Sequence, residues 1–353
     1  MTGVLAGYLR RRVGLQTIGL LVFLAGLMQV LELLDVTNDI LDRDLGVRGI
    51  VYYAWLRSPS ELVLSLPLAV LLGAMSSFYA MAKSQEVTAI RAAGVSLKRL
   101  LVLLLPVPIL LGGVQFFLSQ AVVPKTEARL KAWWDASSPP EDTPPKWVQT
   151  SDGPASFDHA TLDGRRLDGL RLYLRGADGL FSTRVTARQA QWENGTWRLD
   201  DVRELRVSDA GTQRVEEASR SWRINLRPED VVQLDVDQPH LSSIMLVDVI
   251  AGERVGAQPL TYYQTVLYRS FTAPVAAFIM LLLAIPPARM LTRGGGGGSL
   301  LIALGLGLAY LLVDGLMAAM GTSGRMPPLA AALAAPALFI AIGAVQLARC
   351  DRT

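Results

Sequence analysis

The stretch VGLQTIGLLVFLAGLMQVLELL, residues 13 to 34, contains a single charged residue, Glu32. At a rise of about 1.5 Å per residue, a helix of this length matches the thickness of the hydrocarbon layer of a membrane. Arg10, Arg11 and Arg12 precede the stretch, but it is too long for a signal peptide and ends without a small-x-small cleavage pattern. It therefore predicts an uncleaved membrane-spanning helix.

Five further runs share this length and apolar character. They are Leu62 to Ala82, Leu100 to Val123, Val266 to Ile285, Leu300 to Met320 and Leu329 to Ala348. Six spanning helices follow, three on each side of a polar centre. The sequence thus predicts a helical membrane protein with three regions: residues 1–123, an inserted domain at 124–262, and residues 263–353. This organisation excludes most soluble enzymes.

Basic residues gather in alternate loops, which sets the predicted orientation. An excess of Lys and Arg marks the cytoplasmic side of a membrane protein, so both termini are predicted to be cytoplasmic and the central domain to lie outside the cytoplasm. The net charge of +3 then needs no nucleic acid partner. The opposite short loop, Asp35 to Arg57, mixes acidic and basic residues, and the one cysteine, Cys350, rules out an internal disulfide. The basic residues are Arg10 to Arg12, Lys83, Arg91, Lys98, Arg99, Arg289, Arg293, Arg349 and Arg352.

The central domain has the pattern of an all-β fold. Pro124 to Lys146 is charged and then proline-rich, which favours a stalk. β-branched and aromatic residues then nearly alternate with polar ones, and Asn194-Gly195 is a strong hairpin pattern. Short strands at this spacing predict a sandwich or a jelly roll. The expected strands are Lys146 to Thr150, Leu170 to Arg175, Thr183 to Trp192, Trp197 to Arg206 and Ser221 to Leu226.

A short amphipathic helix is predicted at about 84–95, between spans two and three. Val87, Ile90 and Ala93 or Gly94 recur at helical spacing, Ser84 is placed to cap the amino end, and Gly94 to end the helix. Two interpretations remain open: a connector on the membrane surface, or a docking helix for a cytoplasmic partner. The docking residues would be Ser84, Gln85, Glu86, Val87, Ile90, Arg91 and Gly94.

Little in the sequence suggests catalysis. The two histidines, His159 and His240, lack the spacing of a metal site. No HExxH, GxSxG or Walker A pattern occurs, and Gly294 to Gly298 favours a flexible turn. The chain is therefore not expected to be an enzyme, to hold a metal, or to bind nucleotide itself.

Charged residues inside the spans are candidates for function, because a charge in the bilayer is disfavoured. Glu32, Arg269 and Asp314 lie in the outer halves of their spans. They either form structural pairs or line a polar opening to the outer leaflet. Span five also carries small residues that allow close helix packing, within this chain or with another subunit: Gly305, Gly307, Ala309 and Gly315.

Several segments together resemble the lipopolysaccharide export permease family, the paired F and G subunits of the Lpt transporter. The likeness covers nearly the whole chain, and the tryptophan segments and the final-span motif favour the G subunit. The segments are Leu66 to Ala74, Ser84 to Val87, Arg91 to Gly94, Trp197 to Leu199, Trp222 to Pro228, Pro274 with Met280 to Ile285, Tyr310 to Asp314, and Met326 to Pro328.

The resemblance implies a permease of the inner membrane that extracts lipopolysaccharide from the outer leaflet and passes it along a periplasmic jelly roll. The implied partners are an LptF-like permease subunit, a cytoplasmic LptB-like ATPase dimer that uses ATP and Mg, LptC-like and LptA-like bridge proteins, lipopolysaccharide, and membrane lipid. The helix around Glu86 to Gly94 would couple to the ATPase. A non-transporting membrane anchor that displays the β-domain is the alternative.

The sequence departs from the family at the outer part of span one. Family members often place basic residues there, where they meet lipid A phosphates, but this chain has Glu32 and Asp35. Arg48, Arg57 and Arg269 are candidates for phosphate contact, the partner subunit is another source, and metal ions bridging the acidic groups are a third. The candidate lipid cavity is thus Glu32, Asp35, Arg48, Arg57, Arg269 and Asp314.

Overall fold

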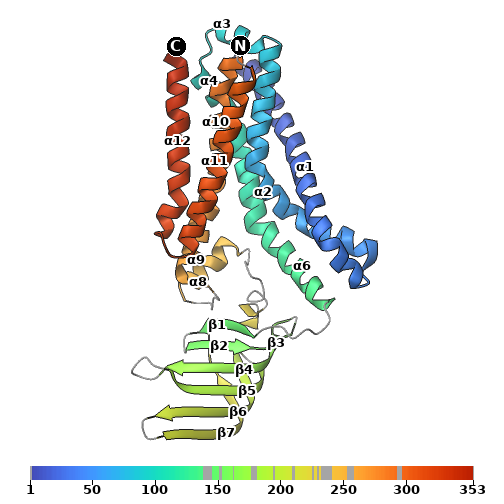
Figure 1. Cartoon of the computed structure of the whole chain (residues 1–353), viewed down its shortest axis with the longest axis vertical. Helices are drawn as coiled ribbons and strands as arrows, with labels where there is room; N and C mark the ends of the chain where they lie inside the picture. Colours follow the sequence, from blue (N-terminus) through green and yellow to red (C-terminus); the bar gives the residue numbers. More distant parts are fainter. Residues whose placement is uncertain are drawn as a thin grey trace. The chain divides into compact units, whose positions relative to one another are not determined.

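A computed structural model of the 353-residue chain divides into two compact units. Residues 1–126 and 264–353 form a helical unit, and residues 127–263 form a second unit built around a β-sheet (Figure 1). The structure describes residues 2–137, 145–150, 153–161, 163–175, 181–193, 195–208, 211–224, 226–228, 230–231, 241–252, 258–291 and 296–352.

The helical unit contains the membrane-length segments. Among the described residues, five helices are long and apolar enough to span a membrane, and a bent pair counted as one span makes a sixth. With the antiparallel sheet inserted between the helices, the predicted class of a helical membrane protein with an inserted β-domain is confirmed. The helices are α1 (Thr2–Asp42), α2 (Gly46–Lys83), α3 (Glu86–Ala92), α4 (Leu97–Leu104), α5 (Pro106–Phe117), the π-helical turn η1 (Leu118–Val122), α6 (Val123–Ala136), α9 (Leu260–Thr272), α10 (Val275–Leu291), α11 (Gly296–Thr322) and α12 (Pro328–Arg352).

The predicted loop from Asp35 to Arg57 is wrong, because this segment is mostly helical. α1 continues to Asp42 and α2 begins at Gly46, so only a three-residue turn separates them. Asp35, Asp39 and Asp42 are all exposed on the last turns of α1. Hydropathy marks where a segment stops being apolar, but a helix continues wherever its polar residues can face outward.

Spans three and four are not straight helices. Span three is interrupted before Pro106 and again at the π-helical turn η1. Span four is the pair α9 and α10, bent by 51° at Ala273 and Pro274. Proline lacks the amide hydrogen that an α-helix needs, and it clashes with the preceding turn. These breaks follow from the sequence, although apolar content alone does not reveal them.

Within the segment predicted as a stalk, α6 remains helical to Ala136. Pro139, Pro140 and Pro144 lie outside the described residues. At the predicted glycine turn, α11 already begins at Gly296, whereas Gly294 and Gly295 lie outside the description.

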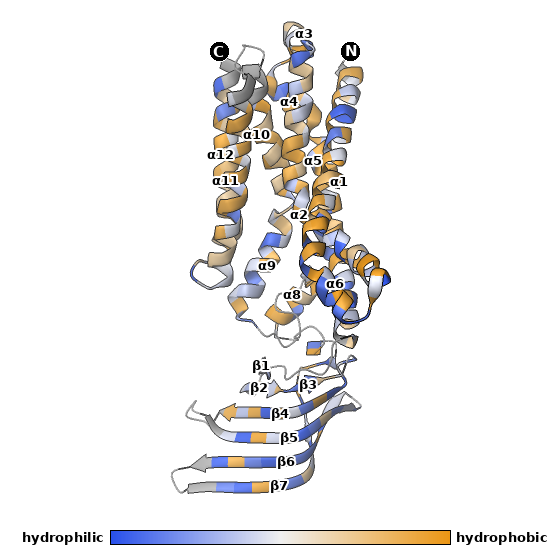
Figure 2. Ribbon diagram, turned by 45° about the vertical axis from the view of Figure 1, so that its right-hand side comes forward, coloured by the Kyte–Doolittle hydropathy of each residue, from blue (hydrophilic) through white to orange (hydrophobic). Residues whose placement is uncertain are grey.

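α2 and α10 form the centre of the helical unit. Every residue from 276 to 285 except Phe278 is buried, and a helix that is apolar all round is expected at such a position. α1 crosses α2 closely at Gly73, where an added Cβ would lie 2.6 Å from the Thr17 Cα. Figure 2 shows hydrophobic colour along the helices, whereas the strands mix hydrophobic and hydrophilic residues.

The second unit holds one antiparallel sheet in the order β1-β2-β4-β5-β6-β7, with β3 paired to β4. β1 and β7 are its edges. The predicted strand Ser221 to Leu226 is wrong: the charged strand β7 ends at Trp222, and β2 and β3 were not predicted. The bounds are β1 (Lys146–Thr150), β2 (Gly153–Phe157), β3 (His159–Ala160), β4 (Arg166–Arg175), β5 (Phe181–Glu193), β6 (Thr196–Ser208) and β7 (Gly211–Trp222), followed by α8 (Ser243–Ile250).

The predicted hairpin at Asn194-Gly195 is confirmed by the pairing of its flanking residues. Glu193 of β5 pairs with Thr196 of β6, which leaves a two-residue loop. Gly195 has a φ of 82°, as a tight hairpin turn requires. Asn194 itself lies outside the described residues.

A crease runs across the sheet at Gly169, Arg188, Asp201 and Ala218. The ladder pairs next to this row keep one register on both sides of it, but the row itself is missing from the pairs of β4–β5, β5–β6 and β6–β7. Gly169 and Asp201 have positive φ, and a Cβ on Gly169 would lie 2.7 Å from the Asp158 Cγ. Each strand therefore changes which residues face the core as it crosses the crease.

The core of the sheet follows this change. On β6, Trp197 and Leu199 are buried before the crease, whereas Val202 and Glu204 are buried after it. Trp197 is fully buried, and its indole N–H donates to the Leu226 carbonyl at 2.8 Å. This bond fastens the segment after β7 to the sheet.

Candidate functional site

α3 is a two-turn helix between α2 and α4, and its ends are fixed by local backbone geometry. Gln85 (φ 62°) turns the chain out of α2. Gly94 (φ 80°) ends α3 as predicted, with the Val95 amide donating to the Ile90 carbonyl at 3.3 Å. The helix is shorter than the predicted range of 84–95.

Ser84 does not cap α3. It occupies the C-cap of α2, and its hydroxyl donates to Glu86 Oε1 at 2.7 Å. The Ser96 hydroxyl, by contrast, accepts from the Arg99 amide and caps α4. α3 and α4 together thus form a compact elbow, which we call the α3–α4 elbow (residues 84–104).

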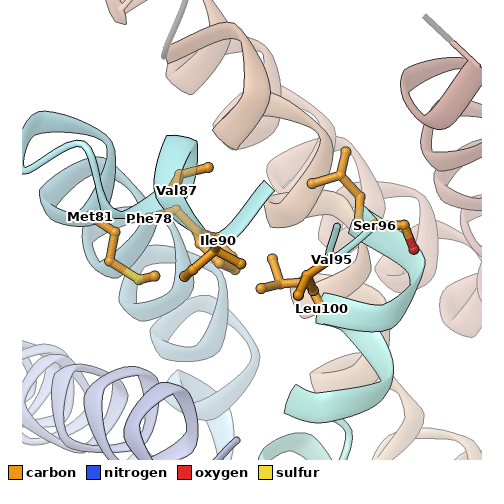
Figure 3. A pocket seen from close by; sticks show the side chains of 8 residues that line it. Phe78, Met81, Val87, Ile90, Val95, Ser96 and Leu100 are labelled. Carbon is orange, nitrogen blue, oxygen red and sulfur yellow. The ribbon is translucent and has the colours of Figure 1, made fainter. Parts of the chain in front are cut away.

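The two faces of α3 have different surroundings. Val87 is 5% exposed and Ile90 is half-buried, and both line a small apolar hollow against Phe78 and Met81 of α2 and Leu97 and Leu100 of α4 (Figure 3). The opposite face is exposed, and its described side chains are small: Thr88, Ala89, Ala92 and Ala93. The amphipathic helix is therefore present, but its apolar face packs inward.

Glu86 is held by side chains from outside its own helix. Tyr8 Oη donates to Glu86 Oε2 at 2.8 Å, and Arg12 Nη1 donates to the same carboxylate at 2.8 and 2.9 Å. The hydrogen bond from Ser84 does most to lower the pKa of the Glu86 carboxyl, burial opposes it, and Tyr8 and Arg12 add to the lowering. Because this pKa is lowered, these contacts stabilise the fold above the ordinary carboxyl pKa and are lost as the pH falls through the lowered value. The Arg91 side chain lies outside the described residues.

Two of the predicted lipid-cavity residues meet between α1 and α2. Arg57 Nε lies 2.7 Å from Glu32 Oε1, and Tyr53 Oη donates to the same oxygen at 2.8 Å. Glu61, a buried residue one turn beyond Arg57, lies 3.8 Å from the same guanidinium. The Glu32 carboxylate is thus satisfied within the chain.

Two others meet between α9 and α11. Arg269 Nη2 lies 2.6 Å from Asp314 Oδ2, and Nη1 donates to the Asp314 carbonyl at 3.1 Å. Both side chains are mostly buried, 26% and 20% exposed. Asp35 and Arg48, in contrast, are exposed and form no ion pair among the described residues. The structure therefore assembles two pairs and leaves Asp35 and Arg48 apart from them.

Asp314→Asn is expected to destabilise the helical unit by about 2 kcal/mol, because removing one partner leaves the mostly buried Arg269 charge unpaired. Replacing both residues with leucine is expected to cost less than this single change. Thermal unfolding of the detergent-solubilised protein measures both. A double variant less stable than Asp314→Asn would contradict this account.

Sequence reasoning missed Tyr8, Tyr53 and Glu61. Each contacts a residue that was singled out, yet Tyr8 is 78 positions from Glu86 in the chain. Glu61 falls one turn after Arg57, so this i,i+4 spacing was the one available indication. Of the two histidines, His159 is exposed on β3 and His240 lies outside the described residues. In the part of the chain that the structure describes, His, Cys, Asp and Glu form no group suited to a metal ion.

The chain was compared with known protein families. The profile of the lipopolysaccharide export system permease LptF/LptG matches residues 7–349, nearly the whole sequence. The chain belongs to this family. It is therefore a permease component of lipopolysaccharide export and a multi-pass protein of the inner membrane. A search of curated proteins gives no match.

Membership in the permease family confirms the resemblance seen in the sequence. The family is one of transport subunits and not of catalytic enzymes. The match covers both permease types, so it does not distinguish the G from the F subunit.

Proposed function

We propose that this chain is the G-type permease subunit of an ATP-driven lipopolysaccharide exporter. It takes lipopolysaccharide from the outer leaflet of the inner membrane and passes it to a periplasmic bridge. The observation that carries the proposal is α3, a short helix with an inward apolar face and an exposed face of small residues, in a chain of the permease family.

The exposed face of α3 supports coupling to a cytoplasmic LptB-like ATPase dimer. Thr88, Ala89 and Ala92 present little bulk, so a groove on a partner can approach the helix backbone closely. Both chain ends lie at the same end of the helical unit as α3 (Figures 1 and 2), and basic residues gather there. This arrangement supports a cytoplasmic position for α3 and both termini. ATP and Mg would be used by the partner.

Two exposed apolar surfaces support pairing with an LptF-like subunit. On α11, Gly305, Ala309 and Leu312 are exposed on one face of the helix. On α1, the side chains of Val22 and Phe23 are more than half exposed. Large apolar surfaces are acceptable in lipid, but small residues at helical spacing favour a second helix.

For the lipid itself, the proposed contacts remain the candidate cavity residues. Arg48 is the exposed cation of that set, and it lies beside Val47, Val51, Tyr52 and Trp55 on α2. A cation among apolar and aromatic side chains suits a phosphorylated lipid. For the hand-over, β1 and β7 are the two ends of the described strand order, where LptC-like and LptA-like proteins would add a strand.

The proposed orientation predicts where fused reporters will lie. A reporter inserted after Ser96, in the α3–α4 elbow, is expected to be cytoplasmic, and one inserted after Ser208, in the sheet unit, is expected to be periplasmic. Enzymes active on one side of the membrane only, such as alkaline phosphatase, measure both positions. Phosphatase activity at Ser96 without activity at Ser208 would reverse the proposed topology.

Gentle purification followed by identification of the bound proteins tests the function. We expect an ATPase dimer and a second permease subunit, and reconstitution of that assembly is expected to release lipopolysaccharide when ATP is added. The anchor alternative predicts that the protein purifies without an ATPase, because an anchor needs no cytoplasmic docking surface. That outcome would contradict the exporter proposal.

A further inference from the structure

α1 is fastened to both ends of the α3–α4 elbow by polar contacts near its amino end. At α3, Tyr8 and Arg12 hold Glu86. At the end of α4, Arg10 Nε donates to the Leu103 carbonyl at 2.7 Å. We call Tyr8, Arg10 and Arg12 the α1 clamp.

Each contact of the α1 clamp uses a group that the elbow leaves available. Leu103 lies in the last turn of α4, where carbonyls lack an intrahelical partner because the helix stops before Pro106. Glu86 lies in the first turn of α3 and points to α1 instead of to the exposed face of its own helix. Arg12 also lies over the Tyr8 ring, with its Cζ 5.6 Å from the ring centroid, so the two donors support one another.

Apolar packing alone holds α3 only weakly. Val87 is its one fully buried side chain among those described, and the hollow beneath Ile90 is not completely filled. α1, in contrast, is anchored at the clamp itself by Leu9 and Val13, both fully buried in the bundle. A displacement of α3 therefore acts on α1 through these polar contacts as well as on α2 through Val87 and Ile90.

We infer that the α1 clamp transmits movement of the α3–α4 elbow to α1, so that α1 moves with the elbow when the partner ATPase moves α3. This inference rests on the proposed function and assigns positioning roles to Tyr8, Arg10 and Arg12, residues distant in sequence from the docking helix. It identifies a pair, Arg12 and Glu86, whose charges can be exchanged. An assembly in which the elbow merely anchors the ATPase would not need this pair.

The experiment compares charge variants in the complete, reconstituted exporter and measures lipopolysaccharide released per ATP hydrolysed. Arg12→Glu is expected to lower this ratio about tenfold while hydrolysis stays within about twofold, because the pair is broken but the docking face is intact. Combining Arg12→Glu with Glu86→Arg is expected to restore the ratio to within about threefold of wild type. The matched control is Arg11→Glu, the same charge change at an exposed neighbour without an ion pair among the described residues, and it is expected to behave as wild type.

Three outcomes separate the hypotheses. A wild-type assembly that hydrolyses ATP and exports, together with an unchanged ratio in Arg12→Glu, would overturn the clamp and leave the proposed function standing. A double variant that still copurifies with the ATPase but exports no better than Arg12→Glu would also overturn it. If the wild-type assembly contains no ATPase or releases no lipopolysaccharide, the proposed function fails, and this inference fails with it.

A milder variant guards against misfolding of Arg12→Glu. Arg12→Gln removes the charge but keeps a hydrogen-bond donor, and it is expected to lower the ratio about threefold. An unchanged ratio in Arg12→Gln, with the assembly intact, counts against the clamp.

Discussion

Replacing Ala89 with tryptophan is expected to abolish lipopolysaccharide export while the chain still inserts into the membrane. Ala89 lies on the exposed face of α3, so the larger side chain disturbs no internal contact of the folded chain. In a partner groove shaped for a small residue, overpacking costs about 1 to 3 kcal/mol, which lowers affinity about fivefold to 150-fold. Copurification of the ATPase and export of lipopolysaccharide measure the two consequences.

The matched control for this variant is Ala128→Trp. Ala128 is also an exposed alanine in a helix, α6, but it is outside the proposed docking face. We expect this control to retain both ATPase binding and export. Normal ATPase binding and export in Ala89→Trp would show that the exposed face of α3 is not the docking surface.

Trp197→Ala is expected to unfold the sheet unit under conditions in which the wild-type unit is stable. The side chain is fully buried, packs edge-on against Trp192 with ring centroids 5.3 Å apart, and binds the Leu226 carbonyl. Truncating a buried tryptophan costs about 3 to 5 kcal/mol, a large share of the stability of a typical domain. Pulse proteolysis of the full chain in increasing urea measures the change.

Trp147→Ala provides the comparison. Trp147 is 54% exposed on the edge strand β1 and stacks on Tyr173 with ring centroids 5.5 Å apart. Its loss is expected to cost about 1 kcal/mol. Equal sensitivity of the two variants to proteolysis would mean that Trp197 is not central to the core.

Hydropathy was sufficient to predict the helical membrane class and the inserted β-structure, because bilayer thickness and strand alternation act locally along the sequence. Hydropathy failed where polar or charged segments form a regular helix or strand. The segment from Asp35 to Arg57 is polar but mostly helical. Strand β7 was missed because its many charged side chains give no alternating apolar pattern, as an edge strand that pairs on one side allows.

The contacts of the candidate site depended on packing that no local pattern encodes. Glu86 was singled out from the docking segment, yet its partner Arg12 was assigned only to the basic residues before span one. The two are 74 positions apart, and their meeting depends on how α1 crosses the end of α2. Arg269 and Asp314 were identified as costly charges in a membrane, and their pairing is one of the two outcomes that this cost predicts.

The crease at Gly169, Arg188, Asp201 and Ala218 limits how far the loss of one residue from a long strand disturbs the sheet. Since side chains alternate with a period of two, removing one residue from β6 on the Trp197 side would turn Trp197 and Leu199 away from the core, while Val202 and Glu204 beyond the crease would stay in place. A register error in one half of the sheet therefore does not extend across the crease into the other half. Each half of the sheet can therefore vary in length at its outer ends without disturbing the inward residues of the other.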